Sequence, residues 1–120
     1  MGKVSVPVPL SDLAEQIERF GPNAYVVTVS AEARPRATSV SVRWHSSLLT
    51  VTAGRRTAGN VEANNAVALL RPAPREGHAL IVDGWGSVHH SHEHDVVVFI
   101  EPQKAVLHVT AQPVVGASHS

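Results

Sequence analysis

The stretch from Leu48 to Arg71, LLTVTAGRRTAGNVEANNAVALLR, decides the fold of this chain. It opens with a short apolar segment, Leu48 to Thr52, whose composition predicts a β-strand. A turn of small residues then leads into a segment of about two helical turns. A second apolar segment, Ala66 to Leu70, predicts another strand. The stretch therefore predicts a strand, a turn, a short helix and a strand in that order.

The turn within this stretch is suited to a phosphate group. Arg55 and Arg56 bring two guanidiniums and Thr57 a hydroxyl to the place where the helix begins. A helix start offers free backbone N–H groups, and both it and an arginine fork favour a bound anion. A solvated turn would carry the same charges, so the two arginines alone leave both interpretations open.

The register of the whole stretch resembles the flavin-binding split-barrel family, whose best-known member is pyridoxamine 5′-phosphate oxidase. In that family a strand is followed by a Ser-Arg-Lys phosphate-binding turn, a short helix, an Asn-Pro pair and another strand. Here the turn reads Arg55-Arg56-Thr57 and the Asn-Pro place is Asn64-Asn65. Upstream, the family has a Gly-x-Pro and a basic residue before a flavin-contacting strand, and this chain has Arg34-Pro35-Arg36 before Ala37 to Trp44. The resemblance covers roughly residues 10 to 110.

The resemblance implies an oxidoreductase that binds FMN and transfers electrons or hydride to or from a small-molecule substrate. It implies no catalytic side chain, because the isoalloxazine ring carries the electrons while the protein binds and orients it. The residues whose positions match the cofactor-binding residues of the family are Arg36, Ser41, Thr52, Arg55, Arg56, Thr57 and Asn60.

The same fold binds a deazaflavin coenzyme in some small relatives, and haem or no cofactor in others. A deazaflavin-dependent reductase and a non-catalytic cofactor-binding or interaction dimer are therefore alternatives. Two departures from the family pattern keep them open. Thr57 stands where the family has its phosphate-binding Lys, and Ser41 stands near a second expected Lys. A hydrogen bond to a charged group is worth about 1.5–3 kcal/mol, so losing both cations would weaken phosphate binding.

The rest of the chain predicts a mainly β protein. Residues 1–9 contain two prolines among valines and predict an extended arm. A helix of about ten residues follows, with an N-cap at Ser11-Asp12, a capping-box partner at Glu15 and a stop at Gly21-Pro22.

Period-two patterns then predict the remaining strands. The strand that begins at Ala24 reads as buried on both faces, whereas one face of the strand at 35–44 is small and polar. The long strand at 79–89 contains Gly84 and Gly86, which suit the bends that a barrel needs. Two more strands are predicted at 96–100 and 105–110. Together these elements predict an antiparallel split β-barrel of six or seven strands, with an N-terminal helix and one short helix.

Composition narrows the functions that the chain can have. The 120 residues suit one domain, with a short tail at 112–120. Ten basic and ten acidic side chains cancel, which disfavours partners such as nucleic acid or an anionic membrane. No cysteine and no secretion signal are present, so we expect a cytoplasmic protein. The resemblance implies a homodimer with each cofactor at the subunit boundary, and a chain this short has too little wall to enclose a flavin alone.

Histidines form the other conspicuous feature. Four of the eight lie in the run His89-His90-Ser91-His92-Glu93-His94. Alternate imidazoles on a strand could bind zinc or nickel. Because the run falls where a solvated hairpin tip is expected, we predict no functional metal site. His78, His108, Trp44 and Trp85 are expected at core or interface positions, and no Gly-x-Ser-x-Gly elbow or Ser-His-Asp order points to a hydrolase.

Overall fold

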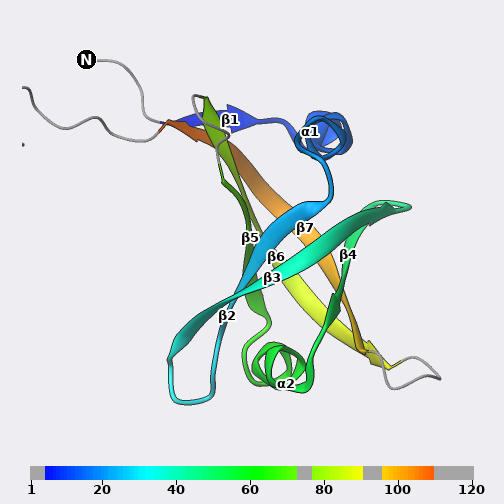
Figure 1. Cartoon of the computed structure of the whole chain (residues 1–120), viewed down its shortest axis with the longest axis vertical. Helices are drawn as coiled ribbons and strands as arrows, with labels where there is room; N and C mark the ends of the chain where they lie inside the picture. Colours follow the sequence, from blue (N-terminus) through cyan, green and yellow to red (C-terminus); the bar gives the residue numbers. More distant parts are fainter. Residues whose placement is uncertain (1–4, 73–76, 91–95, 110–120) are drawn as a thin grey trace, which may run out of the picture.

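A computed structural model describes residues 5–72, 77–90 and 96–109 of the chain (Figure 1). The strands are β1 (Ser5–Val8), β2 (Asn23–Val29), β3 (Pro35–His45), β4 (Leu48–Ala53), β5 (Ala66–Arg71), β6 (His78–His90) and β7 (Val96–Val109). The helices are a short 3-10 helix, η1 (Leu10–Asp12), followed by α1 (Leu13–Phe20), and α2 (Arg55–Ala63).

The strands form one antiparallel sheet with the order β1-β7-β4-β3-β2-β5-β6. β6 also pairs with β7 along most of its length, so six of the strands close into a barrel. β1 lies outside the closed barrel, where Ser5 to Val8 pair with β7. The expected mainly β split barrel with two helices is confirmed, and part of the expected N-terminal arm is strand β1.

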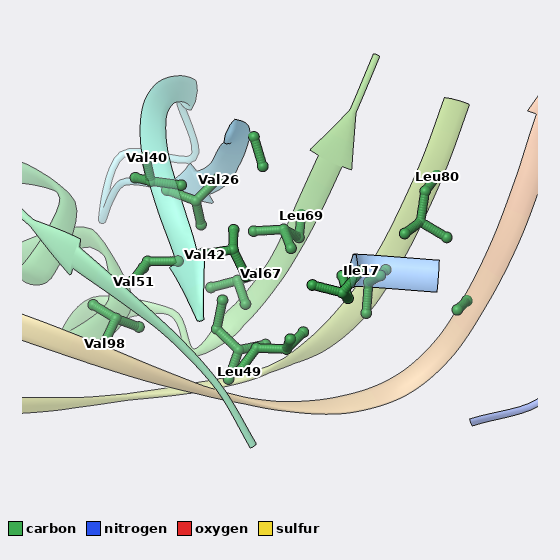
Figure 2. Close-up of a cluster of buried hydrophobic side chains, with 14 of the residues drawn as sticks. Ile17, Val26, Val40, Val42, Leu49, Val51, Val67, Leu69, Leu80 and Val98 are labelled. Carbon is green, nitrogen blue, oxygen red and sulfur yellow. The ribbon is translucent and has the colours of Figure 1, made fainter. Parts of the chain in front are cut away.

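The core fills the inside of the barrel with branched apolar side chains (Figure 2). Val26, Leu49, Leu69 and Val98 are each 0% exposed and come from four different strands. Alternation along each strand sends the other side chains outward. The expectation that β2 is buried on both faces is wrong for the single chain, because its outward residue Tyr25 is 42% exposed.

β7 is one continuous strand, so the prediction of two separate strands at 96–100 and 105–110 is wrong. The sheet absorbs an extra residue there: Asp83 pairs with Lys104 and Gly84 with Pro102, which leaves Gln103 as a bulge. A bulge lets a strand contain a proline that would otherwise interrupt the ladder. Gly84 lies at this bulge, where an added Cβ would be 2.6 Å from the carbonyl oxygen of Glu101.

The two helices lie at opposite ends of the barrel (Figure 1). α1 covers one end with Leu13 and Ile17, both in the core, and ends at Gly21, whose φ is 83°. The predicted N-cap at Asp12 is wrong in its chemistry, because this side chain makes no capping hydrogen bond; η1 begins the helical segment instead. Within the described residues, neither helix has the length and apolar character that a membrane crossing requires.

Candidate functional site: the start of α2 beside β3 and β4

The start of α2 lies where β3 and β4 separate. The two strands pair from Val42 to His45 of β3 and from Leu48 to Val51 of β4. Beyond this point β3 continues along β2, whereas β4 continues along β7 and leads through Gly54 into α2. The separation leaves room at the edge of the barrel for the first turn of the helix.

The first turn of α2 has the features of an anion site. The N-cap residue Gly54 is extended, with φ −81° and ψ 174°, and no side chain among the described residues caps the helix. The first helical hydrogen bond runs from the Ala58 amide to the Gly54 carbonyl at 3.0 Å, so the earlier N–H groups have no helical acceptor. Arg55 and Arg56 are exposed, and the first turn contains no acidic residue. Free N–H groups and two cations therefore gather at one place.

Thr57 and Asn60 point toward the barrel rather than toward solvent. The Thr57 hydroxyl is 3.4 Å from the Thr38 hydroxyl of β3. The Asn60 side-chain amide donates to the Thr28 hydroxyl of β2 at 3.1 Å, a buried contact. These hydrogen bonds fix α2 to two strands, so the structure gives both side chains a positioning role.

The other expected residues lie around the same edge but not on one face. Ser41 and Thr52 are exposed, on β3 and β4 respectively. Arg36 pairs with Thr28 in the sheet, which places it on the side of β3 that faces α2. Arg36 and Ser41 thus lie on opposite faces of β3. The structure brings Thr52, Arg55 and Arg56 to one corner and leaves Arg36 and Ser41 on separate sides of the strand.

Sequence reasoning missed the residues that flank the other side of α2. A hollow of about 400 Å³ is lined by Arg55, Ala58, Glu62, His90 and Val96. His90 and Val96 pair with each other where β6 and β7 close the barrel. Only this closure brings them beside α2, so no local sequence pattern could have indicated them.

A second hollow, of about 460 Å³, lies on the outer face of the sheet, and we call it the histidine groove; its lining is Arg43, Trp44, His45, Thr50, His89, His90, Val97 and Phe99. The Phe99 ring lies 4.4 Å from the His89 ring and 6.1 Å from the His45 ring, centroid to centroid. No local sequence pattern indicates His45 or Phe99, because only the register across β3, β4, β7 and β6 brings them together.

The expectations for the remaining histidines have different outcomes. In the described part of the chain no group of three potential metal ligands occurs, while Ser91 to His94 lie outside it. His108 lies on β7 with a ring nitrogen 3.3 Å from the Ser5 hydroxyl of β1. His78 is exposed, as are Trp44 and Trp85 at 37% and 48%. These last three are therefore not in the core of the single chain, and an interface position for them stays a prediction.

No protein-family model matches the chain, and no curated protein sequence matches it. Solved structures do. HutZ, the haem storage protein from Vibrio cholerae, superposes with a TM-score of 0.67 at 12% identity, over 85% of this chain and 96% of its own. A putative pyridoxamine 5′-phosphate oxidase from Listeria innocua gives 0.67 at 16% identity, over 82% and 98%. The chain has the split-barrel fold. A protein described as an F420 reductase shares it, with a TM-score of 0.59 at 17% identity, over 70% of this chain and 88% of its own.

The resemblance stated from the sequence is thus confirmed at the level of the fold. The split barrel supports different chemistry in these neighbours, because one is described as a haem storage protein and another as a reductase. At such low identity the fold does not select the cofactor.

Proposed function

We propose that the chain is a flavin-binding oxidoreductase that holds the phosphate of FMN at the start of α2. The observation that carries the proposal is the uncapped first turn, where exposed Arg55 and Arg56 flank backbone N–H groups that have no helical acceptor. A phosphate supplies the negative charge and the acceptor oxygens that this arrangement lacks.

The side chains around this corner would bind and orient rather than move protons. Arg55 and Arg56 would hold the phosphate, and exposed Thr52 would offer its hydroxyl to the ribityl chain. Thr57 and Asn60 would act indirectly, because their hydrogen bonds to β3 and β2 fix the angle at which α2 meets the barrel. The bound flavin would supply electron and hydride transfer to or from a small molecule.

The same donors suit the deazaflavin coenzyme, which also carries phosphate. Two arginines without the lysine of the family pattern do not distinguish the coenzymes, and the likeness to an F420 reductase favours testing both. Parallel titrations with FMN and with the deazaflavin separate them. Tighter binding of the deazaflavin would make the chain a deazaflavin-dependent reductase with the same phosphate site.

A second copy of the chain would complete the cofactor site. The outer face of β2, β5 and β6 exposes large apolar side chains, because Tyr25 and Trp85 lie on it. A hollow of about 320 Å³ lies beside Val27, Ala68 and Trp85 on the same face. Exposed apolar areas of this kind mark protein interfaces. We therefore propose a homodimer that covers this face.

The test of the phosphate site is the substitution Arg56→Ala. It should weaken FMN binding by about 1.5–3 kcal/mol, because it removes a charge-assisted hydrogen bond. Fluorescence titration of FMN measures the dissociation constant, and circular dichroism checks the fold. Arg34→Ala is the matched control, since Arg34 is also exposed but lies in the β2–β3 turn. An unchanged dissociation constant for Arg56→Ala would count against the site.

The histidine groove favours haem as a second candidate. It combines His45 and His89, each packed on Phe99, with the cation of Arg43. Imidazole is a common axial ligand of haem iron, and an arginine suits a propionate. Titration with hemin should then give a Soret shift that His89→Ala reduces and that His78→Ala, outside the groove, leaves intact. Equal spectra for the two variants would remove this candidate.

A further inference from the structure

The opposite end of the barrel holds a buried charge that the proposed cofactor site does not use. Arg71 is the last residue of β5 and only 1% exposed. Both terminal nitrogens of its guanidinium, Nη1 and Nη2, are buried and have no hydrogen-bond partner in the described parts of the chain. Buried guanidiniums are normally paired, because removing the charge from water is costly.

The described residues around Arg71 do not neutralise its charge. The guanidinium carbon lies 6.0 Å from the centroid of the Phe20 ring, a weak cation–π contact. One terminal nitrogen is 3.8 Å from where a Cβ on Gly21 would lie, so the cation is beside the carbonyl end of α1. That end carries partial negative charge and favours a cation, but the donors at Nη1 and Nη2 have no acceptor among the described residues. Burial lowers the pKa of Arg71 through desolvation, in agreement with an incomplete set of partners.

Arg71 lines a hollow of about 490 Å³ between α1 and the ends of β5, β6 and β7. The other polar side chains of the lining are Gln16, Arg19, Asn23 and His78, so none of the described lining residues is acidic. Phe20 and Leu107 add an apolar wall. The hollow thus combines hydrogen-bond donors, positive charge and apolar surface.

We propose that this hollow binds a small organic anion, a carboxylate or phosphomonoester attached to an apolar group, with Arg71 as its principal anchor. A carboxylate or phosphate can accept two parallel hydrogen bonds from one guanidinium, which would satisfy both Nη1 and Nη2. The apolar group would lie against Phe20 and Leu107. This hollow is separate from the start of α2, which lies at the other end of the barrel (Figure 1). The anion proposal can therefore be tested independently of the flavin proposal.

Calorimetric titration of the whole chain with benzoate, phenyl phosphate and benzamide tests the proposal at constant ionic strength. Benzamide has nearly the shape of benzoate without its charge. At least one of the two anions should bind, and benzamide should bind more weakly. Arg71→Met should weaken the anion roughly ten- to hundredfold, the equivalent of losing charged hydrogen bonds. Arg34→Met, exposed and outside the hollow, should leave binding unchanged.

Two further variants keep the test decisive. Arg71→Lys retains the charge without the planar fork and should bind the anion with intermediate affinity, which also covers the case in which Arg71→Met does not fold. Glu76 comes five positions after Arg71 in the sequence and lies outside the described residues. If the anions bind only after Glu76→Gln, the chain supplies its own counter-charge and the proposal is wrong. Benzamide binding as tightly as benzoate, or no binding at millimolar concentrations, would also overturn it.

Discussion

At the scale of single residues, side chains that look alike in the sequence have different roles. Arg55 and Arg56 are exposed at the start of α2, whereas Arg71 is buried at the end of β5. Asn60 is buried against Thr28, whereas the exposed Asn64 accepts a hydrogen bond from the Ala66 amide at 3.2 Å. Residue type alone does not separate these roles, since burial and hydrogen-bond partners depend on the closed barrel.

This difference predicts the stability of two asparagine variants. Asn60→Ala should lower the free energy of unfolding by about 1–3 kcal/mol, because it leaves the buried Thr28 hydroxyl without its partner. Asn64→Ala is the control and should cost about 0.5 kcal/mol, as for other exposed positions. Urea denaturation followed by circular dichroism measures both. Equal losses would show that the Asn60–Thr28 hydrogen bond does not fix α2 to the barrel.

At the scale of elements, two glycines mark different requirements of the backbone. Gly84 of β6 lies at the bulge, where a Cβ would be 2.8 Å from the Ile100 side chain as well as close to the Glu101 backbone. At Gly59 of α2, no atom of the described residues lies within 4 Å of such a Cβ. The first glycine allows two strands to approach each other, while the second only weakens a helix.

The two glycines should therefore respond in opposite directions to alanine. Gly84→Ala should destabilise the protein by about 1–3 kcal/mol through overpacking. Gly59→Ala should stabilise it by about 0.5–1 kcal/mol, because alanine is the better helix former. Thermal unfolding of both variants measures the effect. A stable Gly84→Ala protein would argue against the close approach of β6 and β7 at the bulge.

The sequence predicted elements well where a local pattern determines them. Alternation along β3 and the strand–turn–helix–strand order from Leu48 to Arg71 are local, and both predictions are confirmed. The continuity of β7 was missed because Pro102 suggested a break, and only the pairing with β6 shows the bulge that accommodates it. For the candidate site, the sequence indicated residues near the start of α2 but not the directions of their side chains. Whether Thr57 and Asn60 face solvent or the barrel depends on how α2 packs, which a single sequence does not determine.

At the scale of the whole molecule, the barrel presents distinct surfaces at its two ends and on its outside. α2 and α1 cover opposite ends, and the exposed Tyr25 and Trp85 lie on the outer face of the sheet. The proposed cofactor corner, the buried Arg71 and the apolar outer face are therefore separate regions. Substitution of Arg71 should therefore leave FMN binding intact, whereas loss of the dimer should affect the cofactor site that a second copy would complete.

The proposed dimer interface on the outer face has a test of its own. Trp85→Glu should shift the protein from dimer to monomer, because it places a charge on the apolar outer face beside Val27 and Ala68. Trp44→Glu, at an exposed tryptophan outside that hollow, should leave the dimer intact. Sedimentation equilibrium measures the association state of both. A wild-type protein that is monomeric at micromolar concentrations would contradict the proposed interface.

The most direct test of the phosphate site compares FMN with riboflavin, which has the same ring and ribityl chain but no phosphate. Titration of both into the wild-type protein and into Arg56→Ala gives four dissociation constants. The wild type should bind FMN at least about tenfold more tightly than riboflavin, and Arg56→Ala should lose most of that preference while its affinity for riboflavin stays the same. Equal affinity of the wild type for the two flavins, or a preference that survives in Arg56→Ala, would contradict a phosphate held at the start of α2.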